Sequence, residues 1–124
     1  MSEDNTAQLF AEKVRQLKGT QEGIQGLSHW VQFHKKRVGS VVRVFVKEMA
    51  KEGPQYAKRK LLLLYVANDV MQASRRKKEM KPFLDEWGKA LPSAVKYFSK
   101  TCDEKGKAEL SRMLGIWAER QATA

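Results

Sequence analysis

The chain has 124 residues, enough for one domain with its own hydrophobic core and too few for two ordinary ones. Lysine and arginine number 24 against 14 acidic residues, a net charge of +10 that indicates an anionic partner: nucleic acid, phosphoprotein or acidic lipid. No apolar stretch approaches the roughly 18 residues of a membrane span, and the first residues do not resemble a secretory signal. The lone cysteine, Cys102, cannot form an internal disulfide, which suits the reduced cytosol or nucleus. We expect a soluble single domain over residues 1–124.

Two amphipathic helices are predicted near the N-terminus. Apolar residues at near-helical spacing from Gln8 to Leu17 indicate the first, and Lys18-Gly19 supplies its stop. Thr20 is a suitable N-cap for the second helix. This second helix carries apolar residues at i, i+3 and i+7: Ile24, Leu27 and Val31.

The middle of the chain predicts two more helices. Val38 to Met49 has the β-branched content of a strand, but its apolar residues repeat with helical spacing. A lone strand would leave its backbone groups without partners, so we predict a helix there. Gln55 to Ser74 is the most apolar segment, KLLLLYVANDVMQ at its heart. A helix that is apolar nearly all round belongs in the middle of a bundle, so this helix should be central.

The C-terminal third predicts three shorter helices. Pro82 begins one that runs to about Lys89, and Pro92 with Ser93 begins another that ends near Thr101. Asp103 caps a last helix, in which Trp117 should be buried. That helix has an apolar stripe of Leu110, Met113, Leu114 and Trp117. We therefore predict an all-α fold of seven or eight helices, either an antiparallel bundle or a small right-handed superhelix.

The residues that catalysis or metal binding needs are missing. His29 and His34, with one distant cysteine, do not have metal-ligand spacing. No glycine-rich phosphate loop and no nucleophile motif occurs. We expect no enzyme activity, no catalytic residue, no metal and no cofactor.

The predicted central helix carries a polar arc. At 100° per residue one arc of about a hundred degrees holds Tyr65, Asn68, Asp69, Gln72 and Arg76. A buried, unpaired carboxylate is costly, so Asp69 either pairs inside the protein or faces a ligand. Alternatively, Asn68 and Asp69 brace a neighbouring helix terminus.

A basic run, Arg75 to Lys78, follows the arc directly. Such a run can simply solvate a helix end, serve as a nuclear localisation signal or contact RNA phosphates. Together, the arc and the basic run suit an extended polar ligand such as a phosphopeptide.

The same segment, LLLLYVANDVMQASRRKK, resembles the Tyr-Leu-Ala-Asn-Asp-Val-x-Gln-x-Ser-basic signature of CTD-interacting domains, especially the branch of nuclear pre-mRNA regulators and termination factors. GIQGLSHWVQFHKKRVGSVV is similar to that family's second helix and following turn, and LSRMLGIWAER to its closing helix. The resemblance covers roughly residues 5 to 120. It implies a right-handed superhelix of about eight helices, related to VHS and ENTH domains.

The resemblance also implies a function. Its groove would bind the phosphorylated heptads, Tyr-Ser-Pro-Thr-Ser-Pro-Ser, of the RNA polymerase II C-terminal tail as a β-turn. A nuclear role in transcription termination, 3′-end processing or dephosphorylation of that tail would follow.

The family's binding roles carry over to matching residues. Asp69 would accept the heptad tyrosine hydroxyl, Asn68 would hold peptide backbone, and Tyr65 would line the same wall. Arg112, five residues before Trp117, would pair with phosphate on the second-position serine. The full set of predicted phosphopeptide-binding residues is Tyr65, Asn68, Asp69, Gln72, Arg75, Arg76, Arg112 and Thr20.

Two departures concern the peptide contacts. Similar domains use small polar residues in the turn that here reads Lys18-Gly19-Thr20-Gln21-Glu22. Ala73 stands where this branch often has asparagine, and Arg75 and Arg76 are candidates to compensate.

Two other functions fit the sequence less well. An RNA-binding module is supported by the charge of +10 but lacks an evident aromatic stacking platform, so RNA contact through the basic surface is a secondary expectation. An adaptor of the VHS or ENTH type would read sorting peptides or phosphoinositides, but we expect no membrane partner. Because no sustained heptad pattern occurs, the isolated domain should be a monomer.

Overall fold

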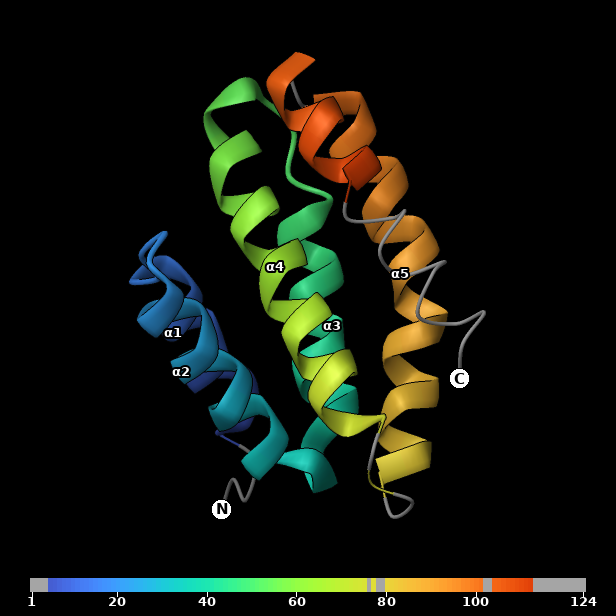
Figure 1. Cartoon of the computed structure of the whole chain (residues 1–124). Coiled ribbons are helices and arrows are strands. Elements are labelled where there is room, and N and C mark those ends of the chain that lie inside the picture. Colours follow the sequence, from blue (N-terminus) through green and yellow to red (C-terminus); the bar gives the residue numbers. More distant parts are fainter. Residues whose placement is uncertain (1–4, 76, 78–79, 102–103, 113–124) are drawn as a thin grey trace.

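The computed structural model describes residues 5–75, 77, 80–101 and 104–112 (Figure 1). Its α-helices are α1 (Thr6–Arg15), α2 (Gln21–Phe33), α3 (Val38–Met49), α4 (Ala57–Ser74) and α5 (Lys81–Thr101), followed by helical residues 104–112. Two 3-10 turns, η1 (Lys35–Arg37) and η2 (Pro54–Tyr56), lead into α3 and α4. The described residues contain no strand, so the all-α prediction is confirmed.

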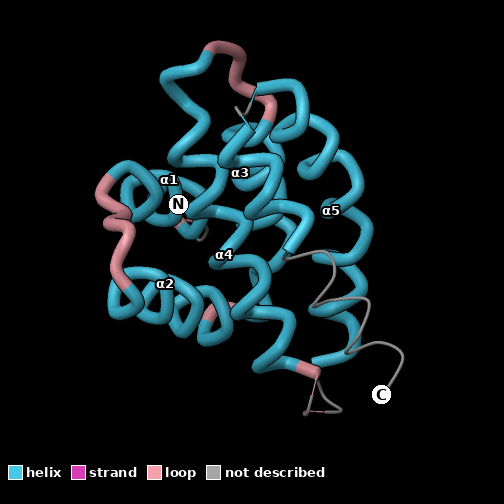
Figure 2. Tube along the Cα trace, turned by 45° about the horizontal axis from the view of Figure 1, so that its top comes forward, coloured by secondary structure: helices cyan, strands magenta, loops and turns pink. Residues whose placement is uncertain are grey.

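Helices pack mainly against the next but one along the chain. α1 packs on α3, α2 on α4 and α3 on α5, and α4 also packs on α5. Figures 1 and 2 show the result, with α4 between α2 on one side and α5 on the other. The prediction that the helix ending at Ser74 is central is therefore confirmed.

The core explains why the strand-like segment 38–49 is helical. Val41, Phe45 and Met49 lie at i, i+4 and i+8, and each is at most 1% exposed. Glu48, seven residues after Val41, is buried on the same helix face, whereas a strand would turn residues seven apart to opposite sides. The Phe45 ring meets the fully buried Trp87 of α5 edge to face, with ring centroids 5.0 Å apart. Burial of such side chains stabilises by about 1.5–3 kcal/mol each.

The start of α2 follows the predicted cap. Thr20 has extended backbone angles, and its hydroxyl oxygen accepts a hydrogen bond from the Gly23 N–H at 3.0 Å. This bond satisfies one of the N–H groups that a helix leaves unpaired at its N-terminus. The Thr20 N-cap is confirmed.

Two predicted helices are one in the structure. We expected one helix to end near Lys89 and another to begin at Pro92, but α5 runs through both positions. Pro92 is exposed, as is Gly88, whose carbonyl loses its helical donor, so water can replace the missing bond. On the inner face a continuous buried stripe holds the helix together: Trp87, Leu91, Ala94 and Phe98.

Several expectations lie outside the described residues. The described part of the chain holds six α-helices, so the predicted count of about eight is not confirmed. Cys102, Asp103, Met113, Leu114 and Trp117 are not described. Among the helices that are described, none combines the length and apolar character that crossing a membrane requires.

Candidate functional site

One face of α4 is open. The partly exposed residues on this face are Leu61, Leu62, Tyr65, Asn68, Asp69, Gln72 and Ala73. At 100° per residue they fall within about 140° of the helix surface, while the fully buried positions lie on the opposite side. Four of the five residues of the predicted arc are therefore on this face, and the fifth, Arg76, lies outside the described residues. Leu61 and Leu62 make the face wider and more apolar than predicted.

Tyr65 and Arg112 meet on one carboxylate. The Tyr65 hydroxyl donates a hydrogen bond to Oε2 of Glu109. Arg112 Nη2 donates to the same oxygen at 3.0 Å. The three side chains therefore connect α4 to helical residues 104–112. The resemblance described under the sequence analysis implies roles for Tyr65 and Arg112, but it did not point to Glu109.

The charges of this group follow from its contacts. The hydrogen bond from Tyr65, followed by that from Arg112, lowers the pKa of Glu109 below its ordinary value. Burial, followed by the hydrogen bond to Glu109, raises the pKa of the Tyr65 hydroxyl. At neutral pH Tyr65 is therefore protonated and donates a hydrogen bond to an ionised Glu109. Arg112 is 58% exposed and has five N–H donors, of which the bond to Glu109 uses one.

A hollow of about 540 Å³ lies next to this group. The turn between α1 and α2, the first half of α4 and helical residues 104–112 surround it. Its apolar lining includes Leu61, Leu62 and Phe98, and its polar lining includes Lys58, Lys105 and Glu109. A hollow of this size is in the range of ligand-binding pockets.

Cations continue along the edge of this hollow. An adjoining hollow of about 510 Å³ shares Gly19, Lys58 and Leu62 with the first and adds Lys18 and Arg59. Gly19 lies close to α4, because a Cβ there would be 3.5 Å from Leu62 Cδ2. The two adjoining hollows, lined by both apolar and positively charged side chains, are together called the α4 groove.

Asp69 lies on the open face beyond the groove. It is half-buried and makes no hydrogen bond or ion pair to another residue that the structure describes. Asn68, Gln72 and Arg75 each have a partner within the molecule. The alternative that Asp69 pairs inside the protein therefore has no support among the described residues. Its carboxylate is available as an acceptor.

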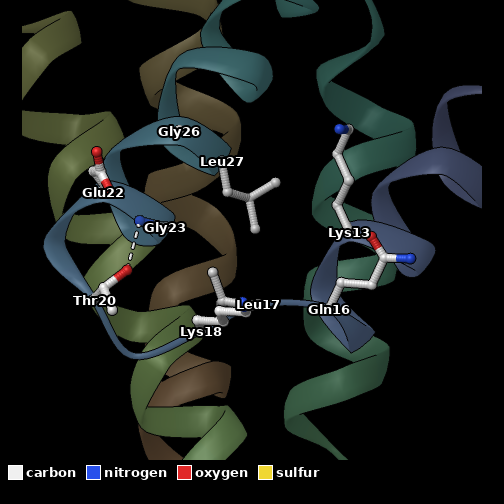
Figure 3. Close-up of a pocket in the computed structure, with 9 residues that line it drawn as sticks. All are labelled: Lys13, Gln16, Leu17, Lys18, Thr20, Glu22, Gly23, Gly26 and Leu27. Carbon is white, nitrogen blue, oxygen red and sulfur yellow. Dashed lines mark hydrogen bonds between the residues drawn. The ribbon is translucent and has the colours of Figure 1, made fainter.

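Two predicted site residues lie elsewhere. Arg75 is exposed at the C-terminus of α4, about 15 Å along the helix axis from Tyr65. Thr20 lines a neighbouring hollow of about 500 Å³ between α1 and α2, which shares Leu17 and Lys18 with the groove, and its hydroxyl caps Gly23 (Figure 3). The structure therefore brings Tyr65 and Arg112 together and places Asn68, Asp69 and Gln72 beside them along α4. It leaves Arg75 apart and Thr20 in the neighbouring hollow.

The described residues contain no group of three or more histidine, cysteine or acidic side chains placed to hold a metal ion. His34 uses its Nδ1, which is 2.8 Å from the Trp30 carbonyl oxygen. His29 is exposed on α2.

The described residues therefore form an all-helical domain with one open helix face beside a cationic groove. The model of the CID domain family matches residues 8–123, and the chain belongs to this family. It is 38% identical over 108 residues to Regulation of nuclear pre-mRNA domain-containing protein 1A of Homo sapiens, covering 87% of this chain and 33% of that protein. The 1B protein of Mus musculus is also 38% identical, with 87% and 32% covered. The chain thus spans about a third of the length of these relatives.

Proposed function

We propose that this domain binds the phosphorylated C-terminal tail of RNA polymerase II along the α4 groove and the open face beyond it. Membership of the CID family supports this role, as does the naming of the relatives for regulation of nuclear pre-mRNA. The observation that carries the proposal is the joining of Tyr65 and Arg112 on Glu109 at the groove. The domain acts by binding, in the nucleus, and links the tail to termination, 3′-end processing or dephosphorylation.

The heptad has the chemistry that the groove accepts. Its tyrosine ring and two prolines suit the apolar lining of Leu61, Leu62 and Phe98. Phosphates on its serines suit the cations on the groove sides. These cations are Lys18, Lys58, Arg59 and Lys105.

Asp69 supports a specific contact with the heptad tyrosine. Its carboxylate is half-buried and has no partner among the described residues, so it can accept a hydrogen bond from the tyrosine hydroxyl. A hydrogen bond to a charged group contributes about 1.5–3 kcal/mol. Asn68 and Gln72, on the same face, would contact the peptide backbone.

Arg112 is the proposed phosphate contact. Its planar group binds phosphate in a bidentate geometry that lysine cannot reproduce. The bond to Glu109 fixes one edge and leaves other N–H donors directed away from it. Loss of this arginine should weaken a phosphopeptide about 10- to 100-fold.

The test is fluorescence anisotropy with two-heptad peptides, unmodified or phosphorylated on the second, fifth or seventh serine. Asp69→Asn and Arg112→Ala are compared with exposed controls of the same chemistry, Asp85→Asn on α5 and Arg43→Ala on α3. Micromolar binding of one phosphopeptide, weakened by the two site variants and retained by the controls, would support the proposal. Absence of binding to every heptad peptide by the folded domain would refute it.

Oligomeric state is a separate part of the proposal. The isolated domain should sediment as a monomer, since the sequence lacks a sustained heptad pattern. A tight dimer would contradict this part without touching the peptide site.

A further inference from the structure

Phe33 is an exposed aromatic side chain at the end of α2. It is 83% exposed, although it is a large apolar residue on the last position of a helix. Among the described residues the other exposed large hydrophobic is Leu9, at 42%. A single exposed apolar side chain is common on protein surfaces, so the significance of this ring depends on what surrounds it.

The ring is held by a series of aromatic contacts that begins in the core. The buried Phe10 stacks on Trp30, and Trp30 packs on the His34 ring with centroids 4.1 Å apart. Phe33 meets His34 edge to face at 5.1 Å. The contact between His34 Nδ1 and the Trp30 carbonyl fixes the His34 ring. Phe33 therefore stands on a rigid support and leaves its own face uncovered.

Three positively charged residues come shortly after Phe33 in the sequence. Lys35, Lys36 and Arg37 form η1, and all three are exposed. The Arg37 N–H donates to the His34 carbonyl at 2.9 Å, so the turn that carries the cations is anchored to the same support. We call Phe33 and these three cations the α2-end surface.

No acidic residue offsets this charge locally in the sequence. Residues 23–47 contain five lysines and arginines and no aspartate or glutamate. The positive potential at the α2-end surface therefore selects an anionic partner.

We propose that the α2-end surface binds single-stranded RNA, with a base stacked on Phe33 and phosphates on Lys35, Lys36 and Arg37. Base stacking on an aromatic ring next to a basic track is the usual way in which proteins hold unpaired strands. The sequence did not predict this ring as an aromatic platform, because the exposure of Phe33 depends on how α2 ends.

Other anionic partners fit less well. Membrane insertion needs several adjacent apolar side chains, and the neighbours of Phe33 in sequence are Gln32, His34 and three cations. A docked protein side chain needs a hollow, and Phe33 does not line the three hollows described above. A flat ring beside a row of cations matches a base and its phosphates.

The surface is also separate from the α4 groove. In Figure 1 α2 ends at the lower edge of the bundle, whereas η2 and helical residues 104–112 lie at the upper edge. The proposal for RNA therefore stands independently of the proposal for the polymerase tail.

The test measures anisotropy of a labelled single-stranded oligouridine over a range of salt concentrations. Phe33→Ala should weaken binding about 5- to 150-fold and leave the salt dependence unchanged, because the ring contacts a base. Phe33→Trp should keep the affinity, and Phe33→Leu should lose it as alanine does, because leucine is apolar but cannot stack. Circular dichroism checks that each variant folds.

The charge contribution has its own variant. Lys35, Lys36 and Arg37 are changed together to glutamine. Each lost phosphate contact should lower the steepness of log affinity against log salt by about 0.7, so the triple variant should lower it by about 2. The matched control changes three exposed lysines of α5, Lys89, Lys96 and Lys100, to glutamine and should alter the steepness much less. Equal effects of both triple variants would show that only net charge matters and would overturn the proposal.

Three further results would also overturn it. One is an unchanged RNA affinity of Phe33→Ala, and another is retention of affinity by Phe33→Leu. The third is Phe33-dependent binding to phosphatidylserine vesicles without Phe33-dependent binding to RNA. Phosphorylated heptad peptides should bind Phe33→Ala as they bind the wild type, which separates failure of this proposal from failure of the peptide proposal.

Discussion

The hydroxyl of Tyr65 on α4 and the carboxylate of Glu109, 44 residues further along the chain, form one hydrogen bond that closes the side of the groove. Arg112 completes the group from the next turn of the same helix. Glu109 therefore holds both Tyr65 and the proposed phosphate contact, Arg112. Stability and ligand binding are coupled at this point.

Tyr65→Phe tests this coupling. The variant keeps the ring and removes the donor to Glu109, so we expect the melting temperature to fall by a few degrees. Tyr56→Phe, in η2, controls for the loss of a tyrosine hydroxyl that makes no hydrogen bond to another described residue. A melting temperature unchanged by Tyr65→Phe would show that the bond does not stabilise the fold.

Glu109 should make stability depend on pH in the acid range. Its pKa in the folded protein is below the ordinary 4.5, because Tyr65 and Arg112 stabilise the ionised form. This stabilisation is fully present above pH 4.5 and is lost as the pH falls through the lower folded value. Urea unfolding of wild type and Glu109→Gln should show a difference near neutral pH that closes in acid.

The control for that titration is Glu104→Gln, since Glu104 lies on the same helix but is 95% exposed. Its difference from wild type should be small over the same range. A difference between wild type and Glu109→Gln that persists unchanged into strong acid would contradict the assigned pKa direction.

Glu109 should also weaken the binding of phosphate. Its carboxylate is 3.0 Å from Arg112, so a phosphate on Arg112 meets a like charge nearby. Glu109→Gln keeps an acceptor for Tyr65 and removes the charge. We expect it to raise phosphopeptide affinity about three- to fivefold and to leave the unphosphorylated peptide unchanged. Isothermal titration calorimetry measures both, and equal gains for the two peptides would count against a phosphate on Arg112.

Phe45 and Phe33 offer the same substitution in opposite environments. Phe45 is 1% exposed and packs against Trp87, so Phe45→Ala should cost about 3–5 kcal/mol of unfolding free energy. Phe33 is 83% exposed, so Phe33→Ala should stay within about 0.5 kcal/mol of wild type. Urea unfolding measures both, and a large loss for Phe33→Ala would show that the ring supports the fold.

Pro92→Ala should stabilise the protein. Pro92 lies inside α5, where a proline removes a helical hydrogen bond and costs up to about 3 kcal/mol. Pro82 stands in the first turn of α5, where no such bond is lost, so Pro82→Ala should have little effect. An unchanged or lower melting temperature for Pro92→Ala would show that Pro92 does not destabilise α5.

Local patterns predicted most of the helices. The spacing of apolar residues identified α3 in spite of its β-branched content, because burial of one face decided the conformation; these residues are Val38, Val41, Val42, Phe45 and Met49. The Thr20 cap was predicted correctly for the same reason: it depends on residues three apart. Pro92 misled the prediction, since its local effect was outweighed by the buried stripe around Trp87 and Phe98.

The site was less accessible to sequence reasoning. The polar face of α4 follows from helical period alone, and an ion pair between Glu109 and Arg112 fits their spacing of three residues. The approach of Gly19 to Leu62, however, depends on how the turn between α1 and α2 packs against α4. The exposure of Phe33 depends likewise on where α2 ends, which spacing does not determine.

The 18 residues of α4 make it about 27 Å long, so its two ends are well separated. The groove lies near the start of this helix, and the α2-end surface lies toward its other end (Figure 1). A peptide and an RNA strand bound at these two surfaces would lie toward opposite ends of the bundle. Each bound chain would raise the local concentration of the other, so two individually weak contacts would act as one tighter attachment.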